Sequence, residues 1–71
     1  MNDLLFIESE IREYARAILN KDDEESVERV LLYLKEKGVA QMQSVFFLIQ
    51  ELGISVHEAN RYVMNSKAWN S

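Results

Sequence analysis

Apolar side chains recur at intervals of three and four residues along four segments of the chain. At about 100° per residue, this spacing places them on one face of an α-helix. The predicted helices cover residues 3–19, 23–37 and 40–52, and a fourth begins at Ser55. No segment of useful length alternates apolar and polar residues with the period of two that is typical of a half-buried strand. We therefore predict an all-α fold, a compact bundle of four helices.

Capping residues mark the ends of these helices. Asp22 and Asp23 are candidate N-caps for the second helix, and the two glycines of the chain, Gly38 and Gly53, suit the left-handed position that ends a helix. Ser55, followed three residues later by Glu58, has the spacing of a capping box. The third and fourth helices are thus expected to form a C-terminal hairpin of helix-turn-helix type.

The third segment is the most apolar, so we expect it to be the most buried helix, at the centre of the bundle. Its main face is predicted to contain Met42, Val45, Phe46, Ile49 and Leu52. The apolar stripes of the other helices should pack against this face. The residues expected in the core are Ile11, Ile18, Leu31, Leu34, Phe46, Ile49 and Leu52.

Length and composition limit both the architecture and the chemistry. The chain has 71 residues and a formal net charge of −4, which suits a single helical domain over residues 1–71. It contains no cysteine, so it can form neither a disulfide nor a thiolate metal site. Its one histidine, His57, has no suitably spaced partner for metal binding or general-base catalysis. We therefore expect no metal, no cofactor and no enzymatic activity.

The longest uninterrupted apolar run, residues 45–49, is far too short to cross a bilayer. The N-terminus lacks the basic region, long apolar core and cleavage site of a secretory signal. We therefore expect a cytoplasmic protein that acts without a membrane.

Three large side chains interrupt the polar faces of the predicted helices. Leu32 and Tyr33 lie among charged positions of the second helix, and Phe47 lies on the polar side of the third. A surface helix needs one apolar stripe, so apolar residues on both sides suggest a second contact surface. For Phe47, a helix surrounded by the other three is an equally good explanation. We predict that the three residues form an interface, either in a homodimer or with another protein.

An acidic cluster begins the second helix and consists of Asp22, Asp23, Glu24, Glu25 and Glu28. Capping plus a solvated helix start explains it without a ligand, because a helix N-terminus favours negative charge. The functional alternative is a docking patch for a basic protein, since charge complementarity speeds encounter and fixes orientation. Together with the apolar residues, this patch predicts a non-enzymatic protein-interaction module: an inhibitor, an immunity-like protein or an adaptor.

The spacing of residues 45–63 also fits a helix-turn-helix unit, which makes a DNA-binding transcriptional regulator the alternative function. The recognition helix of such a unit would offer Arg61 and few other cations. Phosphate contacts supply most nucleic-acid affinity and require Lys or Arg, and the net negative charge repels DNA. We therefore expect no nucleic-acid partner.

The stretch from Val45 to Ala68, with the sequence LGISVHEAN at 52–60, resembles the helical hairpin in the C-terminal domain of the bacterial large-subunit ribosomal stalk protein. In that family, lysines on this face bind translation GTPases. Here His57 and Asn60 stand at the lysine positions, and the strands of the family's α/β domain are lacking. The resemblance therefore implies a shared hairpin without the factor-binding function.

The whole chain also resembles small uncharacterised bacterial helical proteins that end in a similar hairpin, followed by a serine and an Ala-Trp pair, here Ser66 and Ala68-Trp69. Trp69 has two interpretations. It could anchor a partner, as large aromatic residues often do at interfaces. We favour the other interpretation, in which Trp69 folds back and covers the open end of the bundle.

Overall fold

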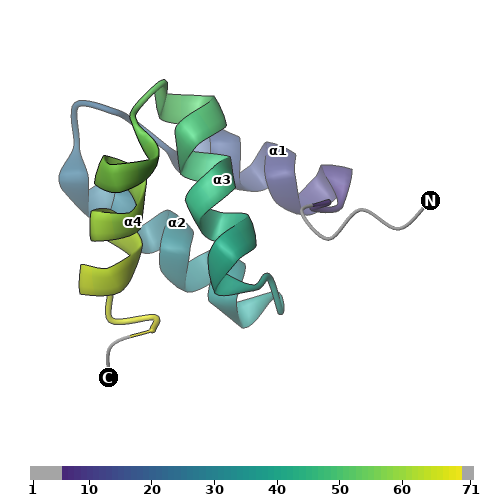
Figure 1. Cartoon of the computed structure of the whole chain (residues 1–71). Coiled ribbons are helices and arrows are strands. Elements are labelled where there is room, and N and C mark those ends of the chain that lie inside the picture. The colour runs from purple at the N-terminus through teal and green to yellow at the C-terminus, as the bar shows by residue number, and fades with distance from the viewer. Residues whose placement is uncertain (1–5, 70–71) are drawn as a thin grey trace.

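The computed structural model describes residues 6–69, which form four helices and no strand. These are α1 (Ser9–Ile18), α2 (Glu24–Glu36), α3 (Gln41–Leu52) and α4 (Val56–Asn65). Helices α3 and α4 stand side by side and run in opposite directions, α2 packs against both, and α1 packs on α2 (Figure 1). The prediction of an all-α bundle of four helices is confirmed. None of the helices in residues 6–69 combines the length and the apolarity that a membrane span needs.

Helix α1 begins at Ser9, which is later than the predicted start at residue 3. Residues 3–5 lie outside the described residues. Glu8, at the N-cap position, has an extended backbone with φ −54° and ψ 143°. A hydrogen bond from α3 holds the segment before Glu8: the side-chain amide of Gln43 donates to the carbonyl oxygen of Phe6 at 2.6 Å. Ile7 is buried in the core from this non-helical segment.

Four of the other helix ends agree with the predicted caps, at Asp23, Gly38, Gly53 and Ser55. Gly38 has φ 83°, and two hydrogen bonds close the end of α2, from Gly38 N–H to the Lys35 carbonyl and from Val39 N–H to the Leu34 carbonyl. This pattern is a Schellman motif, which requires the left-handed residue that glycine adopts without strain. At the start of α4, the Ser55 hydroxyl accepts from the Glu58 N–H at 3.1 Å.

The core is built mainly on α2 and α3. Five of the 13 residues of α2 and four of the 12 residues of α3 are buried, so the third helix is not distinguished from α2 as the most buried one. Leu31 and Leu34 are fully buried, as predicted. Helix α2 contacts each of the other three helices. The other predicted core residues that pack against this centre are only partly buried: Ile11, Ile18, Ile49 and Leu52.

Helix α3 buries a face that is rotated from the predicted one: Val45 is buried as predicted, but Ser44 and Phe47 take the places predicted for Met42 and Phe46. Phe47 is 2% exposed, whereas Phe46 is 38% exposed and Met42 is also exposed. The buried face includes Ser44, whose hydroxyl lies 3.2 Å from the Ala40 carbonyl oxygen and so satisfies its hydrogen bond within the helix. Tertiary packing places Phe47 rather than Phe46 inside, and a serine that satisfies its hydrogen bond within the helix costs little on the buried face. Phe46, which was predicted to belong to the core, therefore lies at the surface.

Candidate interaction surface

Leu32 lies on the outer face of α2 and is 43% exposed, as expected for an interface residue. Tyr33 is half-buried and packs on Tyr14 of α1, with ring centroids 4.7 Å apart and planes tilted by 43°. The Lys37 ammonium group lies 5.7 Å from the centroid of the Tyr33 ring. Tyr14 itself is exposed. The surface therefore consists of Leu32 and the tyrosine pair.

Phe47 does not belong to this surface. It is buried in the core cluster, so its predicted place in an interface is wrong for this fold. The reason is the orientation of α3, which turns Phe47 inwards and leaves its neighbour Phe46 at the surface. Packing of α3 against several elements therefore explains the burial of Phe47, and no partner is needed for it.

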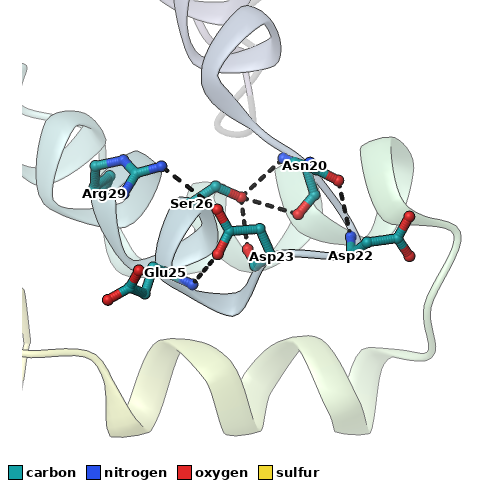
Figure 2. Close-up of polar contacts among 6 residues, drawn as sticks. All are labelled: Asn20, Asp22, Asp23, Glu25, Ser26 and Arg29. Atoms are coloured by element: carbon teal, nitrogen blue, oxygen red, sulfur yellow. Dashed lines mark hydrogen bonds and ion pairs between the residues drawn. The ribbon is translucent and has the colours of Figure 1, made fainter.

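Asp23 has a structural role at the start of α2 (Figure 2). Its carboxylate accepts from the Glu25 N–H at 3.0 Å and lies 3.7 Å from the Arg29 guanidinium. This is the N-cap geometry predicted from the sequence. The capping interpretation is therefore correct for Asp23, which has little freedom to serve a partner.

The buried hydroxyl of Ser26 organises the loop between α1 and α2 (Figure 2). It accepts from the Asn20 N–H at 2.8 Å and lies 2.9 Å from the Asn20 carbonyl oxygen and 2.7 Å from that of Asp23. The Asn20 side chain in turn accepts from the Asp22 N–H at 2.9 Å. These bonds involve the backbone of Asp22, so they fix the loop and leave its carboxylate at the surface.

Glu28 also has a partner, because its carboxylate accepts from the backbone N–H of Lys67 at 3.0 Å. The five acids therefore divide into two groups. Asp23 and Glu28 stabilise the fold, whereas the carboxylates of Asp22, Glu24 and Glu25 form no ion pair or hydrogen bond within residues 6–69. Only these three carboxylates are fully available for a basic partner.

The segment after α4 folds back onto α2. The Lys35 ammonium group donates to the Ala68 carbonyl at 3.0 Å and lies 5.4 Å from the centroid of the Trp69 ring. Ser66 is buried, and its hydroxyl accepts from the Ala68 N–H at 3.1 Å. Trp69 packs, partly buried, against the core cluster. The structure thus agrees with the interpretation of Trp69 as a structural clamp.

A second apolar patch, which was not predicted from the sequence, lies where the N-terminal segment meets α3. Phe6 and Phe46 line a hollow of about 190 Å³, together with Gln43. Met42 lies one helical turn before Phe46 and is also exposed. Met42 and Phe46 were both predicted on the main apolar face of this helix, which the structure turns partly towards the surface.

The outer face of α4 has few groups for chemistry. His57 is exposed, and the Arg61 guanidinium lies 3.9 Å from the Glu58 carboxylate. Val56 and Met64 are exposed apolar side chains on the same helix. Among residues 6–69, no group of three or more His, Cys, Asp or Glu side chains is placed to hold a metal ion.

No protein-family model, curated protein or solved structure matches this chain. Helices α3 and α4 do form a hairpin through Gly53, which belongs to the stretch that resembles the ribosomal stalk protein. The described residues contain no strand, so they do not build the α/β domain of that family. The resemblance stays a prediction about local packing.

Proposed function

We propose that this protein is a non-enzymatic protein-interaction module of the inhibitor, immunity-like or adaptor kind, acting through the outer face of α2. The observation that carries the proposal is the exposed side chain of Leu32 among charged side chains. Arg29, Lys35 and Glu36 line the shallow hollow around it. Glu28 and Glu25 lie one and two turns earlier on the same helical face. An apolar centre within a charged rim is the usual composition of a protein–protein interface.

The tyrosine pair extends this face towards α1. Tyr14 is exposed and is held by its contact with Tyr33, so a partner would meet an aromatic surface that is already ordered. Side chains that are ordered before binding lose less conformational entropy when a complex forms. Leu32 and Tyr14 would therefore supply affinity from rigid helices.

Charge determines the kind of partner. The chain carries a net charge of −4, and Asp22, Glu24 and Glu25 have carboxylates without partners within the described residues. Such a surface attracts a basic protein, a nuclease for example, and accelerates encounter in a salt-dependent way. A second copy of this acidic chain would be repelled by the same charges, although apolar contacts in a homodimer could offset the repulsion.

Capture from a lysate of the native host tests the proposal. The immobilised wild-type protein should retain a specific partner, and Leu32→Ser should lose it while keeping its helical circular dichroism spectrum. Met64→Ser is the matched control, because Met64 is another exposed apolar side chain on a different helix. Equal retention by both variants would contradict a role for α2, and self-association measured by light scattering would identify the homodimer instead.

A DNA-binding regulator remains the second candidate, and the observation that favours it is the α3–α4 hairpin with its short connection. The exposed face of α4 presents Arg61 beside Glu58, which leaves few cations for phosphate groups. Titration with duplex DNA at two salt concentrations separates the two functions. Tight binding that weakens steeply with salt would favour the regulator.

A further inference from the structure

The outer face of α2 carries opposite charges at equal distances from its midpoint, which lies between Leu32 and Tyr33. Arg29 precedes Leu32 by three positions, and Glu36 follows Tyr33 by three. Side chains two turns apart lie almost in line along a helix, so Leu32 and Tyr33 lie on either side of the line from Arg29 to Glu36. Both charged residues are exposed, as Leu32 is. Turning this helix end to end therefore brings each charge onto its opposite.

We propose that the outer face of α2 pairs with the same face of a second copy of the chain, antiparallel, about a two-fold axis between Leu32 and Tyr33. In such an isologous contact, Leu32 of each copy faces Tyr33 of the other, and Arg29 faces Glu36. These contacts lie within about 5 Å of the axis along the helix, where two packed helices touch. The inference rests on the proposed function, because it names a regulation of the same surface: a partner has to displace the second copy.

Charge determines the register of this pairing. With the axis between positions 32 and 33, the next pair outwards is Glu28 with Lys37, again of opposite sign. An axis shifted to position 32 places Arg29 against Lys35, and an axis shifted to position 33 places it against Lys37. Like charges face each other in both shifted registers, which is unfavourable, so the central register is preferred.

The charged groups of this face are available for such a contact. The Glu36 carboxylate forms no ion pair or hydrogen bond within residues 6–69. The Arg29 guanidinium lies 3.7 Å from the Asp23 carboxylate, which is too far for a hydrogen bond, and the Arg29 side chain is 58% exposed. Glu28 uses one oxygen, Oε2, for the Lys67 N–H, and its other oxygen remains. Each copy therefore offers charges of both signs to the other.

The net charge of −4 does not prevent this pairing. Residues 28–37 carry three cations and two carboxylates, so the facing segments are not acidic. The antiparallel arrangement puts the acidic starts of the two α2 helices at opposite ends, and exposed charges more than about 8 Å apart are largely screened at physiological salt. A stable complex uses about 20–30 residues a side, far more than this face offers. The pairing is therefore weak, and it competes with a partner instead of replacing it.

Dilution of the ¹⁵N-labelled full chain from millimolar to micromolar concentration gives the Kd of self-association, from the amide shifts of Leu32 and Tyr33. Arg29→Glu and Glu36→Arg each create two like-charged pairs in the symmetric dimer. Each should raise the Kd at least about tenfold, since two exposed ion pairs contribute up to about fivefold apiece. Net charge alone predicts the reverse for Glu36→Arg, which makes the chain less acidic. Both variants should keep the helical circular dichroism spectrum, because both side chains are exposed.

Mixing the two variants tests the register directly. Unlabelled Arg29→Glu chain added to labelled Glu36→Arg chain should restore the shifts at Leu32, because every altered charge then meets its opposite. Lys21→Glu is the matched control, since it gives the same net charge as Arg29→Glu, whereas Lys21 lines a hollow at the ends of α1 and α3. It should bind the Glu36→Arg chain at least about fivefold more weakly, because one of the two pairs stays like-charged. Wild-type shifts that do not depend on concentration, a tighter Glu36→Arg dimer, or equal binding of the two added chains would overturn the proposal.

The captured partner separates this proposal from the proposed function. If Leu32→Ser releases a partner but the mixed variants do not pair, the self-pairing fails and the interaction function stands. If the mixed variants pair but the wild type retains no specific partner, the interaction function fails and the self-pairing stands without its regulatory role. If both hold, saturating purified partner should abolish the concentration dependence of the wild-type shifts. Its persistence would overturn the competition between partner and second copy.

Discussion

The Lys35 ammonium group lies 5.4 Å from the centre of the Trp69 indole ring and also donates to the carbonyl oxygen of the preceding residue, Ala68. One side chain on α2 thus holds the segment after α4 by two contacts. Glu28, two turns earlier on α2, holds the same segment through the Lys67 N–H. A short tail that α4 alone could not order is fixed in this way against a neighbouring helix.

Lys35→Met should loosen this tail without unfolding the bundle. The substitution keeps the apolar stem and removes the cation–π contact and the hydrogen bond, which together should cost about 1 kcal/mol at an exposed site. Trp69 is the one tryptophan of the chain, so its fluorescence reports the tail directly. Emission should move to longer wavelength as water reaches the ring. Lys37→Met, next to Tyr33, should leave the emission unchanged. A variant at Lys35 with wild-type emission would contradict the clamp.

Phe46 and Phe47 provide a direct test of the orientation of α3. Phe47→Ala should cost about 3–5 kcal/mol, the usual range for removing a buried aromatic side chain. A core of this size supplies about the same stability, so this variant should be largely unfolded at 25 °C. Phe46→Ala should remain folded and lose less than about 1 kcal/mol, because its ring is 38% exposed. Urea denaturation followed by circular dichroism measures both. If Phe46→Ala lost more stability than Phe47→Ala, α3 would bury the face predicted from the sequence.

These two phenylalanines also show where prediction from the sequence reached its limit. The helices and four of their ends follow from local spacing and from caps such as Gly38 and Ser55, because those signals act within a few residues. The direction in which α3 faces depends on tertiary packing. Most of its apolar residues share one face and Phe47 lies on the polar side, so contacts with the other helices decide which phenylalanine is buried. The late start of α1 likewise depends on a long-range bond, from Gln43 to Phe6.

The candidate surface was predictable to a similar extent. Leu32 was recognisable because it interrupts a charged face, and it is exposed. The pairing of Tyr14 with Tyr33 joins two helices, so no pattern within one helix could indicate it. The acidic cluster could be located from the sequence, but its division into structural and available carboxylates could not. That division depends on Lys67, which is 39 positions away from Glu28 along the chain.

Gly38→Ala should destabilise the protein through the backbone alone. Gly38 has φ 83°, and a Cβ atom added there would meet no atom within 4 Å, so no steric clash contributes. The left-handed conformation costs an alanine about 1–2 kcal/mol. We expect Tm to fall by roughly 4–16 °C on this basis. Gly38→Asn should lose less, since asparagine tolerates this conformation better. Equal losses for the two variants would contradict backbone strain as the cause.

The ion pair between Arg16 and Glu51 is expected to couple α1 to α3. The guanidinium donates twice to the carboxylate, through Nε at 2.9 Å and through Nη2 at 3.0 Å, and the two residues are 35 positions apart in the chain. Two parallel bonds restrict the geometry more than a single contact does, and the Glu51 side chain is only 17% exposed. A double-mutant cycle with Arg16→Gln and Glu51→Gln should therefore give a coupling energy of about 0.5–1 kcal/mol at low salt. The coupling should shrink in about 1 M NaCl, where the Debye length is about 3 Å. Additive losses at low salt, with no coupling energy, would show that α1 is held by its apolar contacts alone.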